Sequence, residues 1–254
     1  MTTTTTEAAV SRAEVCAAAC ADLFIGAGEI MASPMGLMPS IGARLARLTS
    51  EPDLLLSDGE AFLLADTPAL GAAGELEGWI PYRRVFDVVA SGRRHVVMGA
   101  NQLDKFGNQN ISCIGDHARP KRQMFGVRGG PGNTINHRTS YWVPRHSTRV
   151  FVDAVDVVSG VGYDKMGDAP AARFLDIHRV VTDLAVLDFG GVDRSIRLAS
   201  VHPGVSPEQV QEATGFDLDV STAGVTRIPN EEELRLIRQV IDPRNARDRE
   251  VPTP

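Results

Sequence analysis

The stretch HVVMGA, residues 95–100, is an apolar run that predicts a β-strand, and runs of the same kind recur along the chain. Comparable runs follow at 150–155 (VFVDAV), 179–189 (RVVTDLAVLDF) and 196–201 (IRLASV). Earlier in the chain, LLL at 54–56 predicts a further buried strand. These runs predict the strands of a sheet, and the segments between them decide how the strands are connected.

Helical patterns lie before, between and after these runs. Residues 11–24 predict a helix whose Ser11 and Glu14 form a capping box. Helices are also predicted over 41–48, over 206–214 and over 231–241. Because strands that alternate with helices need crossover connections, we expect an α/β fold: an open, mostly parallel sheet with flanking helices on both faces.

The length of 254 residues is enough for one substantial core. We expect a disordered N-terminal cap over 1–10, a single α/β domain over 11–241 and a polar C-terminal tail over 242–254. No segment approaches the roughly 20 apolar residues that cross a bilayer, and the threonine-rich start lacks the features of a signal peptide. We therefore expect a cytoplasmic protein that does not associate with membranes.

The net charge of −6, with 43% hydrophobic and 23% charged residues, predicts no general attraction to nucleic acid or to anionic membranes. The cysteines Cys16, Cys20 and Cys113 give neither a disulfide framework nor a zinc quartet. Cys16 and Cys20 lie four residues apart on a predicted helix, so we expect them to pack in the core. The six histidines lack the spacing of a zinc site, and we expect no metal.

The densest cluster of polar and glycine residues lies between residues 99 and 136, which we expect to contain few strands. Its glycines free the backbone to point N–H groups at an anion or an oxyanion, and its basic residues place positive charge nearby. A solvated loop whose glycines serve turns is the alternative. The segment contains neither a Walker A motif nor a dinucleotide fingerprint, which disfavours nucleoside triphosphates and NAD. Among the histidines, which we expect to be structural or exposed, His137 is the best candidate for a functional role because it follows the glycines.

The run DLLLSDGE, residues 53–60, ends abruptly at Ser57 among small and acidic residues. This is the pattern of a buried strand that delivers side chains to a site. The turn expected of a hydrolase nucleophile is absent around Ser57, because no G-x-S-x-G motif occurs there. Ser57 is therefore not predicted to act in a Ser-His-Asp triad.

The chain resembles the beta subunits of family I CoA-transferases of the glutaconate CoA-transferase type, over nearly its whole length. The likeness rests on motifs that occur in the family's order: GANQLDKFGN at 99–108, IGD at 114–116, PK at 120–121 before the glycine loop, VTDL at 181–184, HPGVS at 202–206 and TGFDLD at 214–219. The resemblance implies the open α/β fold of the family. It also implies an alpha subunit as partner, an α2β2 heterotetramer, and an active site at the interface.

In these transferases a glutamate at the end of an early strand attacks the thioester, and the resemblance places that position on Ser57. A serine without a neighbouring base cannot replace an ionised carboxylate, so the transferase cycle should be blocked. Asp58 or Glu60 could stand in, although Asp58 points away from Ser57 on a strand. The glycine loop departs from the family pattern as well, because VRGGPG at 127–132 introduces Arg128.

A transferase scaffold without its glutamate is similar to the steroid ring-opening hydrolases of cholesterol-degrading bacteria. This resemblance implies a CoA thioester of a cyclic enone with a carboxyethyl arm as substrate. The ring opens by water addition and retro-aldol cleavage to a methyl-dioxo-decanedioyl-CoA. No separate cofactor is implied, since CoA is part of the substrate. The candidate catalytic residues are Ser57, Asp58 and Glu60, and the candidate substrate-binding and oxyanion residues are Gln102, Asn108, Arg128, Gly129, Gly130, Gly132 and Asn133.

Two other functions stay open at this point. One is a working acyl-CoA transferase that acts on a dicarboxylic acid such as glutaconate, with Glu60 or Asp58 as nucleophile. The other is a catalytically silent subunit that binds CoA ligands and stabilises its partner. The general base of the hydrolase is expected on the alpha subunit.

Overall fold

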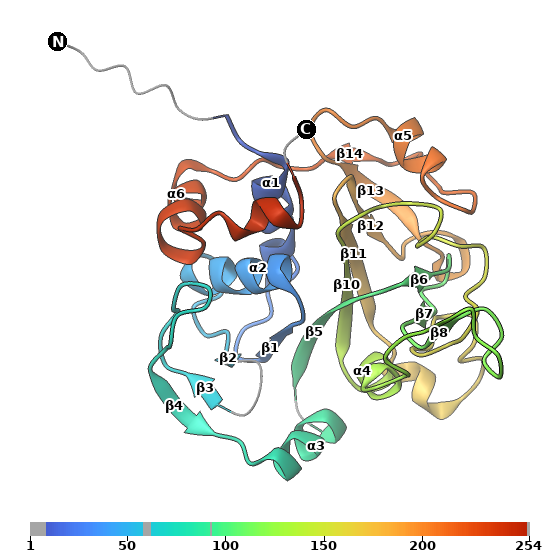
Figure 1. The fold of residues 1–254 in the computed structure, drawn as a ribbon, viewed down its shortest axis with the longest axis horizontal. Helices are drawn as coiled ribbons and strands as arrows, with labels where there is room; N and C mark the ends of the chain where they lie inside the picture. Colours follow the sequence, from blue (N-terminus) through green and yellow to red (C-terminus); the bar gives the residue numbers. More distant parts are fainter. Residues whose placement is uncertain (1–8, 58–61, 92, 253–254) are drawn as a thin grey trace.

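The structure, a computed structural model, describes residues 9–57, 62–91 and 93–252 (Figure 1). A seven-stranded sheet in this part of the chain has the order β1-β5-β10-β11-β12-β13-β14. Its strands are β1 (Met31–Pro34), β5 (Arg94–Gly99), β10 (Arg138–Val143), β11 (Ile177–Thr182), β12 (Ala185–Asp188), β13 (Arg197–Val201) and β14 (Gly224–Val225). β1, β5, β10 and β11 are parallel, β12 is antiparallel to both neighbours, and β14 is parallel to β13. The predicted open, mostly parallel sheet is confirmed.

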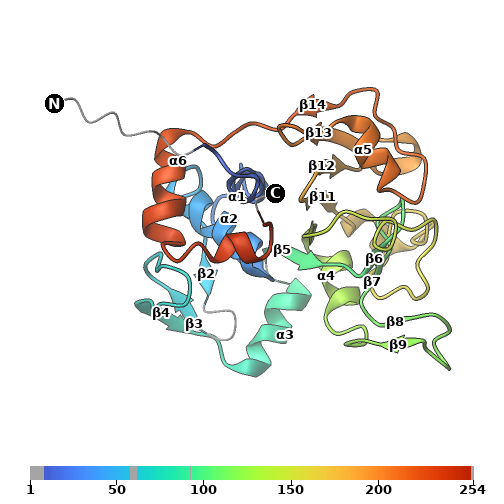
Figure 2. The ribbon, with the colours of Figure 1, turned by 45° about the horizontal axis from the view of Figure 1, so that its top comes forward.

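Helices cover one face of this sheet (Figures 1 and 2). They are α1 (Arg12–Asp22), α2 (Leu37–Leu48), α6 (Glu231–Arg235) and the π-helical turn η3 (Leu236–Ile241) that continues it. α1 and α2 approach closely at Gly42, where an added Cβ would lie 2.5 Å from the Cβ of Cys20. Cys16 and Cys20 are fully buried, and burial raises the pKa of both thiols. The prediction that these cysteines pack in the core is confirmed.

Long connections and short helices cover the other face. The segment after β5 forms two small hairpins and a helix: β6 (Gln102–Leu103) with β7 (Gln109–Asn110), β8 (Cys113–Ile114) with β9 (Arg122–Gln123), and α4 (Gly130–Asn136). Later segments add η1 (Pro170–Phe174), η2 (Val192–Arg194) and α5 (Pro207–Glu212). The buried core of this face includes Val96, Met98, Leu103, Phe151 and Val210. The segment 99–136, which was predicted to contain few strands, thus contains four strands of two residues each and is folded closely onto the sheet.

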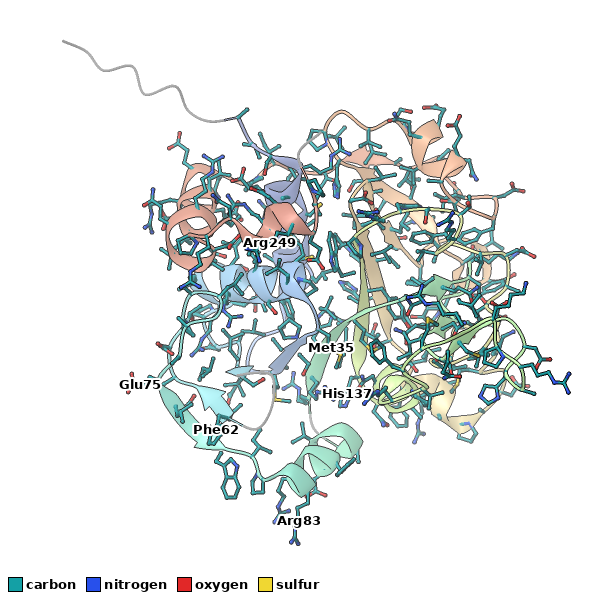
Figure 3. All side chains as sticks on the ribbon, in the orientation of Figure 1. Met35, Phe62, Glu75, Arg83, His137 and Arg249 are labelled. Atoms are coloured by element: carbon teal, nitrogen blue, oxygen red, sulfur yellow. The ribbon has the colours of Figure 1, made fainter. Side chains whose placement is uncertain are left out.

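A smaller unit lies beside β1. It consists of the three-stranded sheet β2 (Leu56–Ser57), β3 (Phe62–Leu64) and β4 (Leu76–Trp79), followed by α3 (Tyr82–Ser91). Figure 3 shows Phe62 and Arg83 on this outlying part of the molecule. The sequence predicted a strand over 54–56, and the structure has β2 over Leu56–Ser57, but the sequence did not predict β3, β4 or α3. Asp58 and Glu60 lie outside the described residues.

The helix caps follow the sequence closely. The predicted capping box forms at Ser11 with Glu14, and Ser206 also forms one, with Gln209. A third capping box joins Asn230 to Glu233 at the start of α6. The residues after η3 are not a free tail: η4 (Ala246–Arg249) packs against α1. No helix among the described residues is long and apolar enough to cross a membrane.

Two strand predictions need correction, and one central strand was missed. Residues 150–155 form turns, because the Ser147 carbonyl accepts the N–H groups of both Val150 and Phe151 and only Phe151 bridges to Leu103. The run 179–189 is two antiparallel strands, since the Thr182 hydroxyl accepts the N–H groups of Leu184 and Ala185 and closes a turn. The sequence analysis also missed β10, a central strand.

Buried neutral histidines make the stability of the fold dependent on pH. His146 lies between the hydroxyls of Thr182 and Thr214, and burial lowers its pKa to about 3. His202 bonds the Thr182 carbonyl, and burial lowers its pKa to about 4. Both values lie below the ordinary 6.5, so the unfolded rings take up protons before the folded ones do.

We therefore expect the free energy of unfolding to be fully supported by these rings above about pH 6.5 and to fall as the pH drops below it. The slope approaches about 1.4 kcal/mol per pH unit for each histidine. Urea unfolding at pH values between about 7.5 and 5 measures it. His146→Gln should reduce the slope, whereas His117→Gln, at an exposed ring, should keep it. An unfolding free energy that does not decline in this range would contradict the assignment.

Candidate active site

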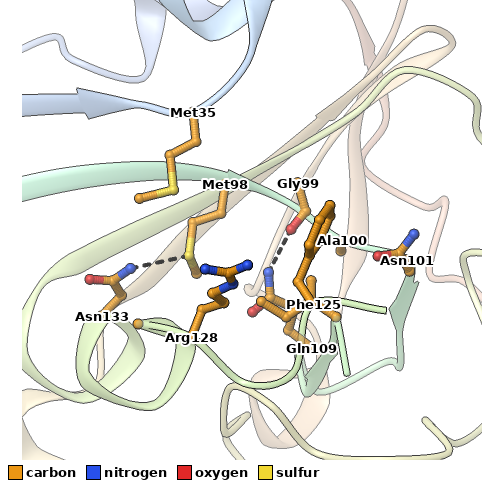
Figure 4. Close-up of a pocket in the computed structure, with 12 residues that line it drawn as sticks. Met35, Met98, Gly99, Ala100, Asn101, Gln109, Phe125, Arg128 and Asn133 are labelled. Atoms are coloured by element: carbon orange, nitrogen blue, oxygen red, sulfur yellow. Dashed lines mark hydrogen bonds between the residues drawn. The ribbon is translucent and has the colours of Figure 1, made fainter. Parts of the chain in front are cut away.

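A cavity of about 530 Å³ opens where β5 ends (Figure 4). Its lining comes from the ends of β1 and β5, from the hairpin after β5 and from the glycine loop before α4. The lining residues are Met35, Met98, Gly99, Ala100, Asn101, Gln109, Ile111, Phe125, Arg128, Gly129, Gly130 and Asn133. The carboxyl ends of parallel strands meet at this edge, which is where open α/β sheets bind ligands.

Backbone pairing fixes the apolar wall of the cavity. β1 and β5 run in register from Met31 beside Arg94 to Pro34 beside Val97, and the Met35 N–H then donates to the Val97 carbonyl at 2.8 Å. This pairing carries Met35 and Met98 to the same end of their strands. Flexible methionine side chains adapt to ligand shapes, so the wall suits an apolar ring.

Arg128 is the one charged residue among those that line the cavity in the described part of the chain. Its φ of 49° lies in the left-handed region, a conformation uncommon for residues other than glycine. The guanidinium lies 5.5 Å from the ring centre of Phe125, whose side chain is also exposed. No described residue forms an ion pair with Arg128. A positive charge is therefore presented to an otherwise uncharged cavity.

The other predicted loop residues divide between ligand-facing and structural positions. Gly129 and Gly130 line the cavity, but the Gly130 N–H already donates to the Val127 carbonyl at 2.9 Å. Gly132 lies in the first turn of α4 and is not part of the lining. Asn133 lines the cavity, and its Nδ2 donates to the Met98 sulfur at 3.3 Å. The prediction of Gly130 and Gly132 as oxyanion donors is not supported by these contacts.

Gln102 and Asn108 do not face the cavity. The Gln102 amide donates to Asp156 at 3.0 Å and accepts from Asn110 at 2.7 Å. The Asn108 amide donates to both oxygens of Asp104 and, at 2.7 Å, to Asp164. Burial raises the pKa of Asp104 although the Asn108 bonds act in the opposite direction. Within this chain their amides join the loops behind the cavity, and substrate binding by Gln102 and Asn108 stays a prediction.

Two amides that the sequence analysis did not single out line the cavity instead. Gln109 donates from Nε2 to the Gly99 carbonyl at 2.6 Å, and its Oε1 is buried without a partner among the described residues. Asn101 is exposed at the cavity rim. Asn101 lies inside the 99–108 motif, and Gln109 follows it directly. The strands here are too short for the sequence to show which side chains face the cavity.

Ser57 lies at the end of β2, at the same edge of the molecule as the cavity. Leu55 forms an isolated parallel bridge with Met31, so the chain that leads to Ser57 runs alongside β1. Ser57 is half-buried and pairs with Leu63 of β3. β1 separates it from β5, and Ser57 is not among the residues that line the cavity. No group of three or more histidine, cysteine or acidic residues in the described chain could hold a metal ion.

Comparisons with known proteins show which proteins this chain resembles. No protein-family model matches the chain. The B subunit of the 3-oxoadipate CoA-transferase of Pseudomonas knackmussii is 32% identical over 214 residues, which are 79% of this chain and 82% of that protein. The cholesterol ring-cleaving hydrolase IpdB subunit of Rhodococcus jostii is 64% identical over 253 residues, 99% of both chains. The crystal structure of Rhodococcus jostii IpdAB superposes with a TM-score of 0.94 at 65% identity, covering 96% of this chain and 99% of that one.

The fold, the cavity at the strand ends and these relatives define a beta subunit with the CoA-transferase scaffold. Within that class, the chain belongs to the family of cholesterol ring-cleaving hydrolase IpdB subunits. These relatives confirm both resemblances that the motifs indicated, to the CoA-transferase beta subunits and to the steroid ring-opening hydrolases.

The structural role of Asn108 is testable. Asn108→Ala removes the partner of two carboxylates and of the Gly162 N–H, which donates to Asn108 Oδ1 at 2.8 Å. We expect the free energy of unfolding to fall by about 3 kcal/mol, because buried polar groups lose their partners. Urea unfolding measures the loss. Asn101→Ala, at the cavity rim, is the matched control and should leave stability unchanged, so equal stability of the two variants would contradict the role given to Asn108.

Proposed function

We propose that this chain is the beta subunit of a heteromeric hydrolase that opens the last ring of a steroid-derived cyclic enone CoA thioester. The observation that carries the proposal is the 64% identity to the IpdB subunit along 99% of both chains. The alpha subunit completes the site, and an α2β2 assembly is our proposal for the stoichiometry. Three free, buried cysteines suit a reducing cytoplasm, where we place the enzyme.

The residue at Ser57 agrees with hydrolysis rather than transfer. A carboxylate can accept an acyl group and pass CoA on because it is ionised at neutral pH, whereas a serine must first lose a proton. We propose that Ser57 occupies the position of the transferase glutamate and orients water or substrate. The serine is smaller than the glutamate, which leaves room at the sheet edge for a ring.

The reaction needs no acyl-enzyme. Water adds across the enone: its oxygen bonds the alkene carbon beta to both carbonyls, and a proton goes to the neighbouring carbon. A base then removes the proton of the resulting tertiary alcohol, a ketone forms, and the C–C bond breaks. Its electron pair becomes a 1,3-dicarbonyl enolate that is finally protonated, so one water is consumed. The protein must supply a base and donors for the enolate oxygens.

This chain supplies shape and donors rather than the base. Met35 and Met98 give an apolar wall, and the amides of Asn101, Gln109 and Gly129 are the candidate donors at the cavity. The described lining of the cavity contains no carboxylate or histidine. We therefore assign the general base to the alpha subunit.

Arg128 recognises the carboxylate of the carboxyethyl arm in this proposal. We expect Arg128→Gln to lower kcat/KM for the acid-bearing CoA thioester at least about tenfold, since a hydrogen-bonded charge pair contributes about 1.5–3 kcal/mol. The loss should vanish with a substrate whose arm is a neutral methyl ester. Arg122→Gln, at an exposed arginine of the same segment that does not line the cavity, is the control. Steady-state kinetics on the alpha/beta complex decide, and equal losses on both substrates would exclude this role.

Mass spectrometry in oxygen-18 water tests the function itself. When the alpha/beta complex is incubated with the ring enone CoA thioester, the product should gain one labelled water and keep its CoA. Ser57→Ala should slow ring opening more than Arg122→Gln does. A thioester that stays closed, or a Ser57→Ala variant as active as that control, would contradict the function or the role of Ser57, respectively.

Acyl-CoA transfer is the second candidate, because the 3-oxoadipate CoA-transferase relative is 32% identical over most of the chain. A transferase with Asp58 or Glu60 as nucleophile would pass CoA to an added dicarboxylic acid. It would also form an enzyme thioester that borohydride reduces. Borohydride trapping followed by peptide mass spectrometry therefore separates the two functions, and the hydrolase should give no reduced residue.

A further inference from the structure

A second cavity, of about 630 Å³, lies at the opposite edge of the sheet, where β11 begins and β12 ends. β11 is parallel to β10 and β5, so its first residues lie at the edge away from the candidate active site. The six residues of β11 span about 20 Å at the usual strand rise. The two cavities are therefore separate sites on one sheet.

Three arginines from three elements converge on this second cavity: Arg173 of η1, Arg179 of β11 and Arg194 of η2. Within the described residues none of them forms an ion pair. Guanidinium groups bind phosphate and carboxylate oxygens through paired hydrogen bonds. Their convergence in a concave surface indicates an anionic ligand with several charges.

The acidic residues at this cavity are already neutralised from outside it. Asp176 accepts from Arg138 at 2.8 Å, and Asp188 accepts from Arg197 at 2.7 and 3.2 Å. Burial alone would raise the pKa of Asp188, but the Arg197 bonds, with a smaller contribution from Arg179, lower it. Neither Arg138 nor Arg197 lines the cavity. The three lining arginines are thus excess positive charge.

The backbone holds one of these arginines in a strained conformation. Asp193 and Arg194 have φ of 54° and 59°, in the left-handed region that residues other than glycine seldom adopt. The turn is closed by the Gly191 N–H bond to the Ser195 carbonyl at 3.0 Å. It places the Arg194 guanidinium 4.7 Å from the ring centre of Tyr163.

Tyr163 is itself fixed, because its hydroxyl donates to the Ile177 carbonyl and accepts the Ile177 N–H, both at 2.9 Å. The ring thus holds the Arg194 guanidinium in place, and a guanidinium has five N–H donors with which it can bind a ligand. Phe189 lies against Tyr163 at 5.5 Å between ring centres and adds a flat apolar wall.

We propose that this cavity, lined by Arg173, Arg179 and Arg194, binds a phosphate-bearing anion, either inorganic diphosphate or the phosphates of a nucleotide. The site is independent of ring opening, since its residues take no part in the first cavity. A nucleotide would add contact between its base and the aromatic wall, whereas diphosphate would use the arginines alone.

Isothermal titration calorimetry on the intact alpha/beta complex tests this with two probes, sodium diphosphate and adenosine diphosphate. We expect binding that weakens with added salt, and at least about a tenfold loss of affinity in Arg194→Gln and in Arg179→Gln. Arg194→Lys keeps the charge but loses the planar guanidinium with its paired N–H donors, so it should recover only part of the affinity. Arg84→Gln, at an exposed arginine of α3 paired with Asp87, is the control and should bind as the unaltered complex does.

Tighter binding of adenosine diphosphate would identify a nucleotide as the source of the phosphates, and equal binding would identify the inorganic anion. Absence of binding to the intact complex would overturn the proposal. That result is expected if acidic side chains of the alpha subunit cover this cavity. Unchanged affinity in Arg194→Gln and Arg179→Gln would overturn it as well. Thermal melting of each variant complex confirms that the altered chain is folded.

Discussion

The parallel pairing of β5 with β1 on one side and β10 on the other determines where the rest of the chain lies. Along β5 the side chains alternate between two cores, with Val97 in the helix-covered core and Val96 and Met98 in the opposite one. A slip of one residue would exchange these faces, so the burial on both sides fixes the register. That register ends β5 beside Met35, and the chain that leaves it at Gly99 builds most of the cavity wall.

The same arrangement makes this chain half of a site. The cavity has an apolar wall, amide donors and one guanidinium, yet its described lining contains no group that can remove a proton from water at neutral pH. Water addition and retro-aldol cleavage both require such a group. In the proposed reaction the partner therefore supplies the base for proton transfer, while the proposed part of this chain is to hold the ring and to stabilise the enolate. The heteromer follows from the chemistry as well as from the relatives.

Local signals in the sequence predicted the parts of the fold that local energetics control. The capping box of Ser11 with Glu14 and the helix start at Ser206 depend on residues within one turn, and the structure forms both. The run 150–155 was wrong because its β-branched and aromatic residues are buried in turns, where tertiary contacts override strand propensity. β10 was missed for the same reason, since RTSYWV has polar residues that a central strand buries beside the histidine and threonine of its neighbours.

The site residues show the same limit. The motif around Asn108 pointed to the right segment, but whether an amide faces the ligand or the loops behind it depends on contacts with residues more than fifty positions away, such as Asp164. Charge behaves similarly. The net charge of −6 argues against polyanionic partners in general, yet it is an average: one guanidinium lines the first cavity and three line the second, at opposite edges of one sheet. Because fields inside such hollows are set by the nearest charges rather than by the total, an acidic chain can still select small anions.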